Sequence, residues 1–143
     1  MAQASIYLNF NGNAEEAFNH YKKAFGTEFS APLMRFKDTP QGGAMPEADQ
    51  NKVAHAAMHI LGGSQIMATD MLESWGQKVV AGNNFSINLA PDSKEEADRL
   101  YSELSEGGTD AVPPHDEFWG YGGSCTDRFG IRWMINVIKW QQQ

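Results

Sequence analysis

The segment "NAEEAFNHYKKAFG" (13–26) has a counterpart far along the same chain in "SKEEADRLYSELSEGG" (93–108). In both segments apolar residues recur at helical spacing, so each predicts an amphipathic helix with one buried face. A chain that contains the same helix twice is expected to contain two similar halves. The shared residues are Glu15, Glu16, Ala17 and Tyr21 in the first copy, and Glu95, Glu96, Ala97 and Tyr101 in the second.

The ends of both predicted helices carry the expected signals. Asn13 and Ser93 are the predicted N-caps, because short polar side chains accept hydrogen bonds from the first turn. Gly26 is the predicted C-terminal stop of the first helix. The paired glutamates fall in the first turn, where the helix dipole favours anions. We therefore interpret them as helix-start residues rather than as catalytic carboxylates.

Segments with strand character surround each helix. "SIYLNF" (5–10) and "FSINLA" (85–90) precede the two helices and alternate between apolar and polar residues, as a half-buried strand does. Three further strand candidates follow each helix, so each half is predicted to be β-α-β-β-β. In the first half they are "EFSAPLMRF" (28–36), "VAHAAMHIL" (53–61) and "SQIMATDML" (64–72), with a loop at 37–52; in the second half they lie within 110–138.

These patterns predict one α+β domain over residues 1–143, built from two modules with mixed sheets that form a cup. The first module is expected at about 1–74 and the second at about 80–140. Such a duplication would give each half-sized sheet a partner against which to complete its core.

Composition excludes several classes of partner. A net charge of −7 and scattered basic residues argue against nucleic acid, which requires clustered Lys and Arg. No apolar run is long enough to span a membrane, and residues 1–10 lack the features of a secretory signal. Cys125 is the single cysteine, which fits a reducing cytoplasm, and we interpret it as an apolar filler rather than a catalytic thiol.

Three stretches together resemble the vicinal oxygen chelate superfamily, and within it the PhnB-like branch. They are "YLNFNGNAEEAFNHYKKAFG" (7–26), "HAAMHILGGSQIMATD" (55–70) and "EFWGYGGSCTDRFGIRWMINVIK" (117–139). The superfamily includes glyoxalase I, bleomycin-resistance proteins and extradiol dioxygenases. The resemblance implies the paired-module cup and a homodimer. Proteins of this branch often carry a methyltransferase label, but "GYGG" is no dinucleotide fingerprint. We therefore expect no cofactor.

The resemblance also identifies where metal ligands would lie, on the first and last strand of each module. Hydroxyls, amides and thioethers are poor ligands for Zn, Ni, Mn or Fe, which prefer imidazole, carboxylate or thiolate. We therefore expect a metal-free site. The corresponding residues are Ser5, Met67, Ser86 and Met134, and two residues further along the same faces are Tyr7, Thr69, Asn88 and Asn136.

The histidines do not form an evident metal site. His55 and His59 would share one strand face about 13 Å apart, too far for a single ion. His55 remains a candidate for ligand contact or acid–base chemistry. His115 is expected in a loop beside Asp116 and Glu117, where three successive residues rarely converge on an ion.

Trp119 and Tyr121 lie in the glycine-rich stretch "EFWGYGG" (117–123). Aromatic rings flanked by glycine often form a ligand wall, but they could equally fill the core or a dimer contact. With the cup-facing positions they complete the predicted substrate-binding set. That set is Tyr7, Asn9, His55, Met67, Thr69, Ser86, Asn88, Trp119, Tyr121, Met134 and Asn136.

Three functions remain open from the sequence. The favoured one is a metal-free protein that binds a small organic molecule and works as a cytoplasmic homodimer. The second is a metal-dependent lyase, isomerase or dioxygenase, with ligands drawn from His55, Asp70 or Glu117. The third is a metal-free enzyme with His55 or Glu117 as general base. Large aromatic residues favour the homodimer, namely Trp75, Trp119, Trp133 and Trp140.

Overall fold

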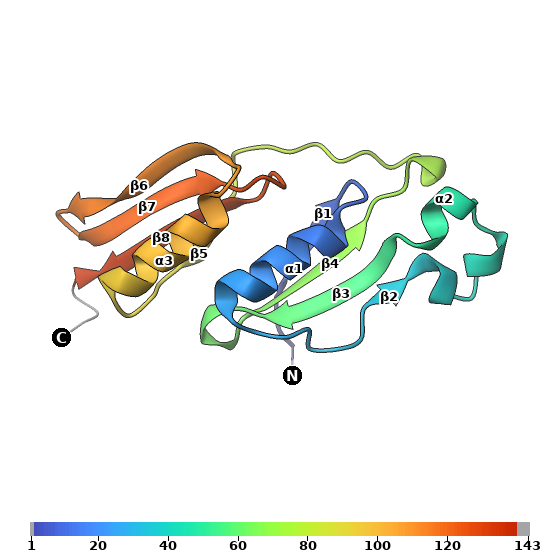
Figure 1. Ribbon diagram of the computed structural model, residues 1–143, viewed down its shortest axis with the longest axis horizontal. Coiled ribbons are helices and arrows are strands. Elements are labelled where there is room, and N and C mark those ends of the chain that lie inside the picture. Colours follow the sequence, from blue (N-terminus) through green and yellow to red (C-terminus); the bar gives the residue numbers. More distant parts are fainter. Residues whose placement is uncertain (1, 140–143) are drawn as a thin grey trace. The chain divides into compact units, whose positions relative to one another are not determined.

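A computed structural model describes residues 2–139. The chain divides into two compact units, Met1–Val80 (unit 1) and Ala81–Gln143 (unit 2), and Figure 1 labels their helices and strands. The modules at about 1–74 and 80–140 stay a prediction. Their origin by duplication stays a prediction, and position 140 lies outside the described residues. Across residues 2–139 there is no helix with the length and apolar character needed to cross a bilayer.

Unit 1 is a four-stranded sheet that carries one long helix. The sheet order is β1-β4-β3-β2, in which β1 runs parallel to β4 and the other neighbours are antiparallel. The elements are β1 (Ile6–Phe10), α1 (Ala14–Phe25), β2 (Met34–Arg35), η1 (Phe36–Asp38), η2 (Gly42–Ala44), α2 (Glu47–Gln50), β3 (Val53–His59), η3 (Leu61–Gly63), β4 (Gln65–Asp70) and η4 (Glu73–Trp75).

Unit 2 has the same sheet order, β5-β8-β7-β6, again with only the first pair parallel. The predicted α+β fold with mixed sheets is therefore confirmed. The elements are β5 (Ile87–Leu89), α3 (Lys94–Ser105), β6 (Thr109–Glu117), β7 (Gly120–Thr126) and β8 (Arg132–Ile138).

Both long helices bury the predicted apolar face. In α1 the buried residues include Ala17, Phe18 and Tyr21, and in α3 they include Ala97 and Leu100. Phe10 of β1 meets Phe18 edge-on with ring centroids 6.3 Å apart, so α1 packs on its own sheet through aromatic contacts.

The two helix starts differ from each other. Ser93 caps α3 as predicted, because its Oγ accepts a hydrogen bond from the Glu96 N–H at 3.2 Å. The predicted side-chain cap by Asn13 is wrong. The N–H of Ala14 instead donates to Oδ1 of Asp70 at 2.9 Å. A carboxylate from the end of β4 therefore replaces the local cap.

The strand predicted over 28–36 is mostly wrong. Only β2 and an isolated bridge between Phe29 and Met58 pair with β3. Pro32 lies between these two points and has no N–H to donate to a ladder, which interrupts the strand. The predicted loop at 37–52 is compact, because Phe36 and Met45 form a small core with Leu72.

Candidate functional site

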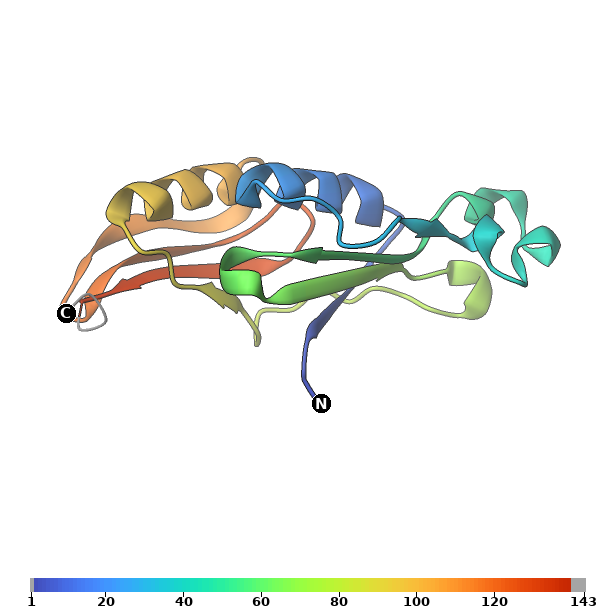
Figure 2. The same ribbon diagram turned by 90° about the horizontal axis from the view of Figure 1, so that it is seen from below.

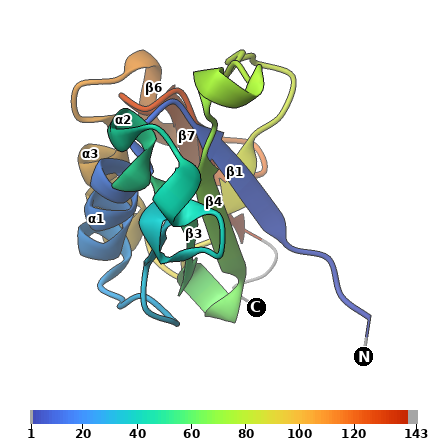
Figure 3. The same cartoon turned by 90° about the vertical axis from the view of Figure 1, so that its right-hand side faces the viewer.

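In unit 1 the helix α1 covers one face of the sheet (Figure 3). The opposite face carries residues predicted to bind ligand. We call this opposite face the helix-free face. Strand alternation places Leu8 and Phe10 in the core and leaves Tyr7 and Asn9 on the helix-free face. Tyr7 stands beside Met67 in the β1–β4 register, and Asn9 beside Thr69. The expected metal-ligand position Met67 therefore lies beside Tyr7.

Tyr7 and His55 form the polar contact of this face. The Tyr7 hydroxyl lies 3.0 Å from Nδ1 of His55, and the two rings are tilted with centroids 5.8 Å apart. Partial burial raises the pKa of Tyr7 above its usual value because it disfavours the phenolate. Tyr7 therefore stays protonated near neutral pH and can donate a hydrogen bond. His55 is thus held in a polar contact on the predicted face.

In unit 2 the helix α3 covers one face of its sheet (Figure 2). The opposite face again carries polar side chains. Asn88 of β5 stands beside Met134 of β8, whose side chain is 41% exposed. Nδ2 of Asn136 donates a hydrogen bond to Oδ1 of Asn88 at 2.6 Å. Ser86 lies just before β5 and is half-buried. The structure therefore brings three predicted site residues together on this face, namely Asn88, Met134 and Asn136.

Trp119 also lies on the helix-free face of unit 2, although it is not part of a strand. It lies in the turn between β6 and β7, and its ring reaches over Gly122. A Cβ at Gly122 would lie only 2.7 Å from Cη2 of Trp119 and would also collide with Asn136. The glycine therefore makes room for the indole ring beside Asn136.

Tyr121 does not join Trp119, although the two are close in sequence. It pairs with Val137, on the face that carries α3, and its hydroxyl donates to Oδ1 of Asp98 in that helix at 2.6 Å. Nζ of Lys94 lies over its ring, 5.0 Å from the centroid. Gly120, at φ +150°, is the first residue of β7, so Trp119 belongs to the turn and Tyr121 to the strand.

His115 and Glu117 form a pair that the sequence did not predict. The expected loop is wrong, because both residues belong to β6, where alternate residues share a face. Nε2 of His115 lies 2.7 Å from Oε1 of Glu117, and Nδ1 lies 2.9 Å from the carbonyl oxygen of Pro113. The Pro113 carbonyl and then the Glu117 carboxylate raise the pKa of His115, since both stabilise the imidazolium. Asp116 points to the other face and binds Lys94 at 3.0 Å.

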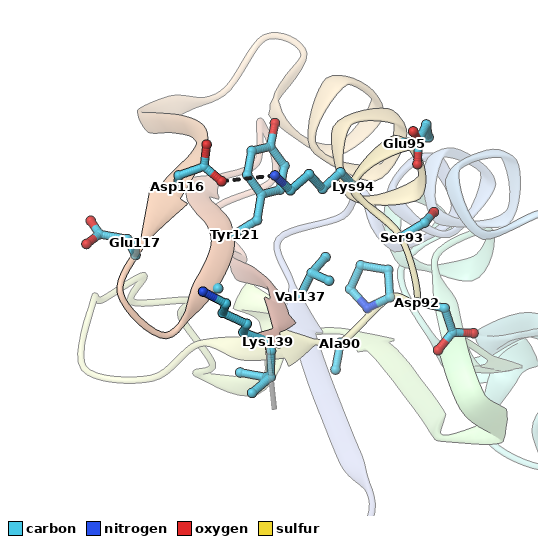
Figure 4. A pocket seen from close by; sticks show the side chains of 13 residues that line it. Ala90, Asp92, Ser93, Lys94, Glu95, Asp116, Glu117, Tyr121, Val137 and Lys139 are labelled. Atoms are coloured by element: carbon cyan, nitrogen blue, oxygen red, sulfur yellow. Dashed lines mark hydrogen bonds and ion pairs between the residues drawn. The ribbon is translucent and has the colours of Figure 1, made fainter. Parts of the chain in front are cut away.

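A separate pocket of about 940 Å³ lies at one end of unit 2 (Figure 4). Its walls are the loop from Ala90 to Ser93, the ends of β6 and β7, and the last residues of β8. Tyr121, Lys94 and Asp116 form one side, and Lys139 lies at the edge. Tyr121 is thus the single member of the predicted set that lines this pocket.

The four side chains that the parallel strand pairs set beside one another do not suit a transition metal. Tyr7, Met67, Asn88 and Met134 supply a phenol, an amide and thioethers. Within residues 2–139, no three His, Cys, Asp or Glu side chains are grouped closely enough to hold an ion. Asp70, offered above as an alternative ligand, is buried, and its two oxygens accept backbone N–H groups of Ala14 and Val53. The residues present therefore do not fit the metal that the superfamily implies.

Comparison with known proteins identifies the family. Residues 2–136 match the family model described as 3-demethylubiquinone-9 3-methyltransferase. The chain belongs to this family. Protein YjdN of Escherichia coli K12 is 32% identical over 148 residues, covering 96% of both chains. The resemblance to the PhnB-like branch is thereby confirmed.

Solved structures of family members and of more distant proteins show the same fold. Protein PA1353 from Pseudomonas aeruginosa is 36% identical, with a TM-score of 0.83 over 96% of this chain and 98% of that one. A Bacillus cereus protein described as a putative 3-demethylubiquinone-9 3-methyltransferase, PhnB protein, gives a TM-score of 0.77 at 22% identity, with 95% and 99% coverage. A glyoxylase/bleomycin resistance protein/dioxygenase domain from Frankia gives 0.67 at 11% identity, with 97% and 98% coverage. Because their identities are low, the Bacillus cereus and Frankia structures show only that this chain shares their fold.

Proposed function

We propose that this PhnB-like protein binds a small organic molecule on the helix-free faces of its sheets, without a metal ion. One observation carries the proposal. In both units the parallel strand pair sets a hydrogen-bonding side chain beside a thioether, Tyr7 with Met67 and Asn88 with Met134. Metal-dependent relatives are expected to hold their ligands on these same strands.

The chemistry of these side chains suits a neutral or weakly charged organic ligand. An amide both donates and accepts hydrogen bonds, and a phenol that stays protonated donates one. A thioether gives soft contact to apolar or aromatic groups of many shapes. The remaining predicted members of this site are Asn9, His55, Thr69, Ser86, Trp119 and Asn136.

A thermal-shift screen of a metabolite library tests this proposal, on protein purified in the presence of a chelator. We expect at least one compound to raise the melting temperature of the metal-free protein, since a ligand that binds only the folded state stabilises it. Asn136→Ala should weaken that shift, because it removes the donor to Asn88. Asn84→Ala is the matched control, since it removes an exposed amide outside the sheet. A shift that appears only after a divalent metal is added would contradict the proposal.

The homodimer and the cytoplasmic location belong to the same proposal. Of the four tryptophans, Trp75 is 52% exposed and available for a contact, whereas Trp133 is fully buried and cannot contribute. Trp140 lies outside the described residues. Sedimentation at micromolar concentration should therefore give a dimer, and a pure monomer would contradict this part of the proposal.

A further inference from the structure

Four side chains form a continuous row across the helix-free face of unit 2. The strand register sets His115 of β6 opposite Gly122 of β7, and Gly122 opposite Asn136 of β8. The Trp119 ring occupies the space above Gly122, and Asn136 bonds to Asn88 on β5. The row therefore reads imidazole, indole, amide, amide from one edge of the sheet to the other.

The indole ring is held in place but not enclosed. Gly122 lies beneath it, and the Trp119 side chain is only half-buried. The backbone of the turn is bonded to the residue after β8, because the Lys139 N–H donates to the Trp119 carbonyl at 2.9 Å. A flat aromatic surface on a rigid turn is suited to stacking against another flat ring.

The imidazole end of the row is bonded to acceptors through both of its nitrogens. Both ring nitrogens of His115 lie within hydrogen-bond distance of acceptors, the Pro113 carbonyl and the Glu117 carboxylate. Both nitrogens must donate to satisfy these contacts, so the geometry favours the doubly protonated ring. Glu117 neutralises part of that charge on the same strand. The other end of the row has the second N–H of Asn136, since an amide has two and one is used by Asn88.

We propose that this row binds a planar, conjugated molecule that carries an acceptor oxygen, such as an aromatic carboxylate, stacked on Trp119. The oxygen accepts the second N–H of Asn136, while His115 and Glu117, bonded to each other, occupy the other end of the row. This inference rests on the proposed function, because it names the ligand class of the same face.

Matched ring pairs test the inference directly. Benzoate and cyclohexanecarboxylate have the same charge and ring size, but only benzoate is flat. We expect ligand-observed NMR titration to give benzoate about fivefold tighter binding than its saturated partner, consistent with an aromatic contact of this kind. Trp119→Leu should abolish that preference. Trp75→Leu, which removes an exposed indole in unit 1, should leave it unchanged.

The outcomes separate this inference from the proposed function. Equal binding of the two acids, or an unchanged preference in Trp119→Leu, would overturn the inference and leave the metal-free function standing. Library hits without any planar, conjugated molecule among them would do the same. Binding of neither acid, with no hit in the library, would overturn both. If Trp119→Leu fails to fold by circular dichroism, Trp119→Phe keeps a smaller flat ring and should give an intermediate preference, whereas an unchanged one overturns the inference.

Discussion

Units 1 and 2 share a sheet order but use their buried carboxylates in opposite ways. In unit 1 Asp70 is 2% exposed and joins segments far apart in sequence. In unit 2 Asp127 is 3% exposed and accepts hydrogen bonds from residues close to it in the chain. A buried carboxylate therefore stabilises unit 1 through contacts that are distant in sequence, and another stabilises unit 2 through contacts that are close in sequence.

Asp70 ends β4 and connects three elements. Its Oδ1 accepts the N–H of Ala14 at the start of α1, and its Oδ2 accepts the N–H of Val53 at the start of β3, at 2.8 Å. Both donors are buried, so the carboxylate supplies partners that water cannot. This contact explains why α1 needs no side-chain cap from Asn13.

Asp127 organises the turn between β7 and β8. Its Oδ1 accepts the N–H groups of Phe129 and Ile131 at 2.9 and 3.0 Å, and its Oδ2 accepts Nε1 of Trp133 at 2.8 Å. The indole ring of Trp133 is fully buried in unit 2. The turn and the core below it therefore share one carboxylate, while the helix start of unit 2 depends on Ser93.

The largest expected effect is that of Asp70→Ala. The substitution leaves two buried N–H groups without acceptors, each at a cost of about 1–3 kcal/mol, so we expect a loss of about 4 kcal/mol in the free energy of unfolding. Urea denaturation followed by circular dichroism measures it. Asp70→Asn keeps one acceptor oxygen and should lose less. A loss below about 1 kcal/mol for Asp70→Ala would contradict the long-range role of this carboxylate.

Asp127→Ala should cost somewhat less, about 2–3 kcal/mol, because the turn donors Phe129 and Ile131 are near the surface and can bond to water instead.

Cys125 allows this effect to be assigned to unit 2. It is the single cysteine, fully buried, and burial raises the pKa of its thiol to about 11, so it reacts only when unit 2 opens.

Thiol labelling of the two aspartate variants therefore sharpens the comparison. Asp127→Ala should accelerate labelling of Cys125 about 50-fold, because its loss of about 2–3 kcal/mol in the free energy of unfolding raises the open fraction of unit 2 by that factor. Asp70→Ala should accelerate the labelling far less. Equal acceleration by both variants would show that the two units open in a single step. It would contradict the claim that Asp70 stabilises unit 1 and Asp127 stabilises unit 2 separately.

The helix caps provide a smaller, matched test. Ser93→Ala removes the hydrogen bond to the Glu96 N–H and should cost about 1 kcal/mol. Asn13→Ala removes no cap contact and should change stability by less than about 0.5 kcal/mol. Urea denaturation of both variants checks the difference. Similar losses would mean that Asn13 caps α1 after all.

The smallest expected effect concerns His115. Its pKa is raised in the folded state by Pro113 and Glu117, so its stabilising contribution is complete below the ordinary pKa of 6.5 and is lost as the pH rises through the raised value. His115→Gln should therefore lower the melting temperature slightly at about pH 5.5 and not at about pH 9. A difference that grows with pH would contradict the doubly protonated ring.

Features that depend on neighbouring residues could be predicted from the sequence, and those that depend on distant ones could not. The buried faces of α1 and α3 and the cap at Ser93 follow from local spacing. Asp70 could not be found this way, because its partner Ala14 lies 56 positions away along the chain. The two units could be placed in a common fold because the resemblance covered most of the chain.

The site was predicted less completely than the fold. Asn88, Met134 and Asn136 share a face as expected from alternation. The pair His115–Glu117 was missed because Pro113 and Pro114 favoured a loop, although β6 is an edge strand and tolerates proline. Trp119 and Tyr121 were grouped as one possible ligand wall because glycines flank both, and the sequence does not show that a turn and a strand place them on different faces.

Native mass spectrometry of freshly purified protein, prepared without added ions, tests the central claim most directly. Our account predicts that the chain carries no stoichiometric transition metal and that any bound species is an organic molecule of low mass. One equivalent of zinc, nickel, manganese or iron retained by the folded protein would contradict it.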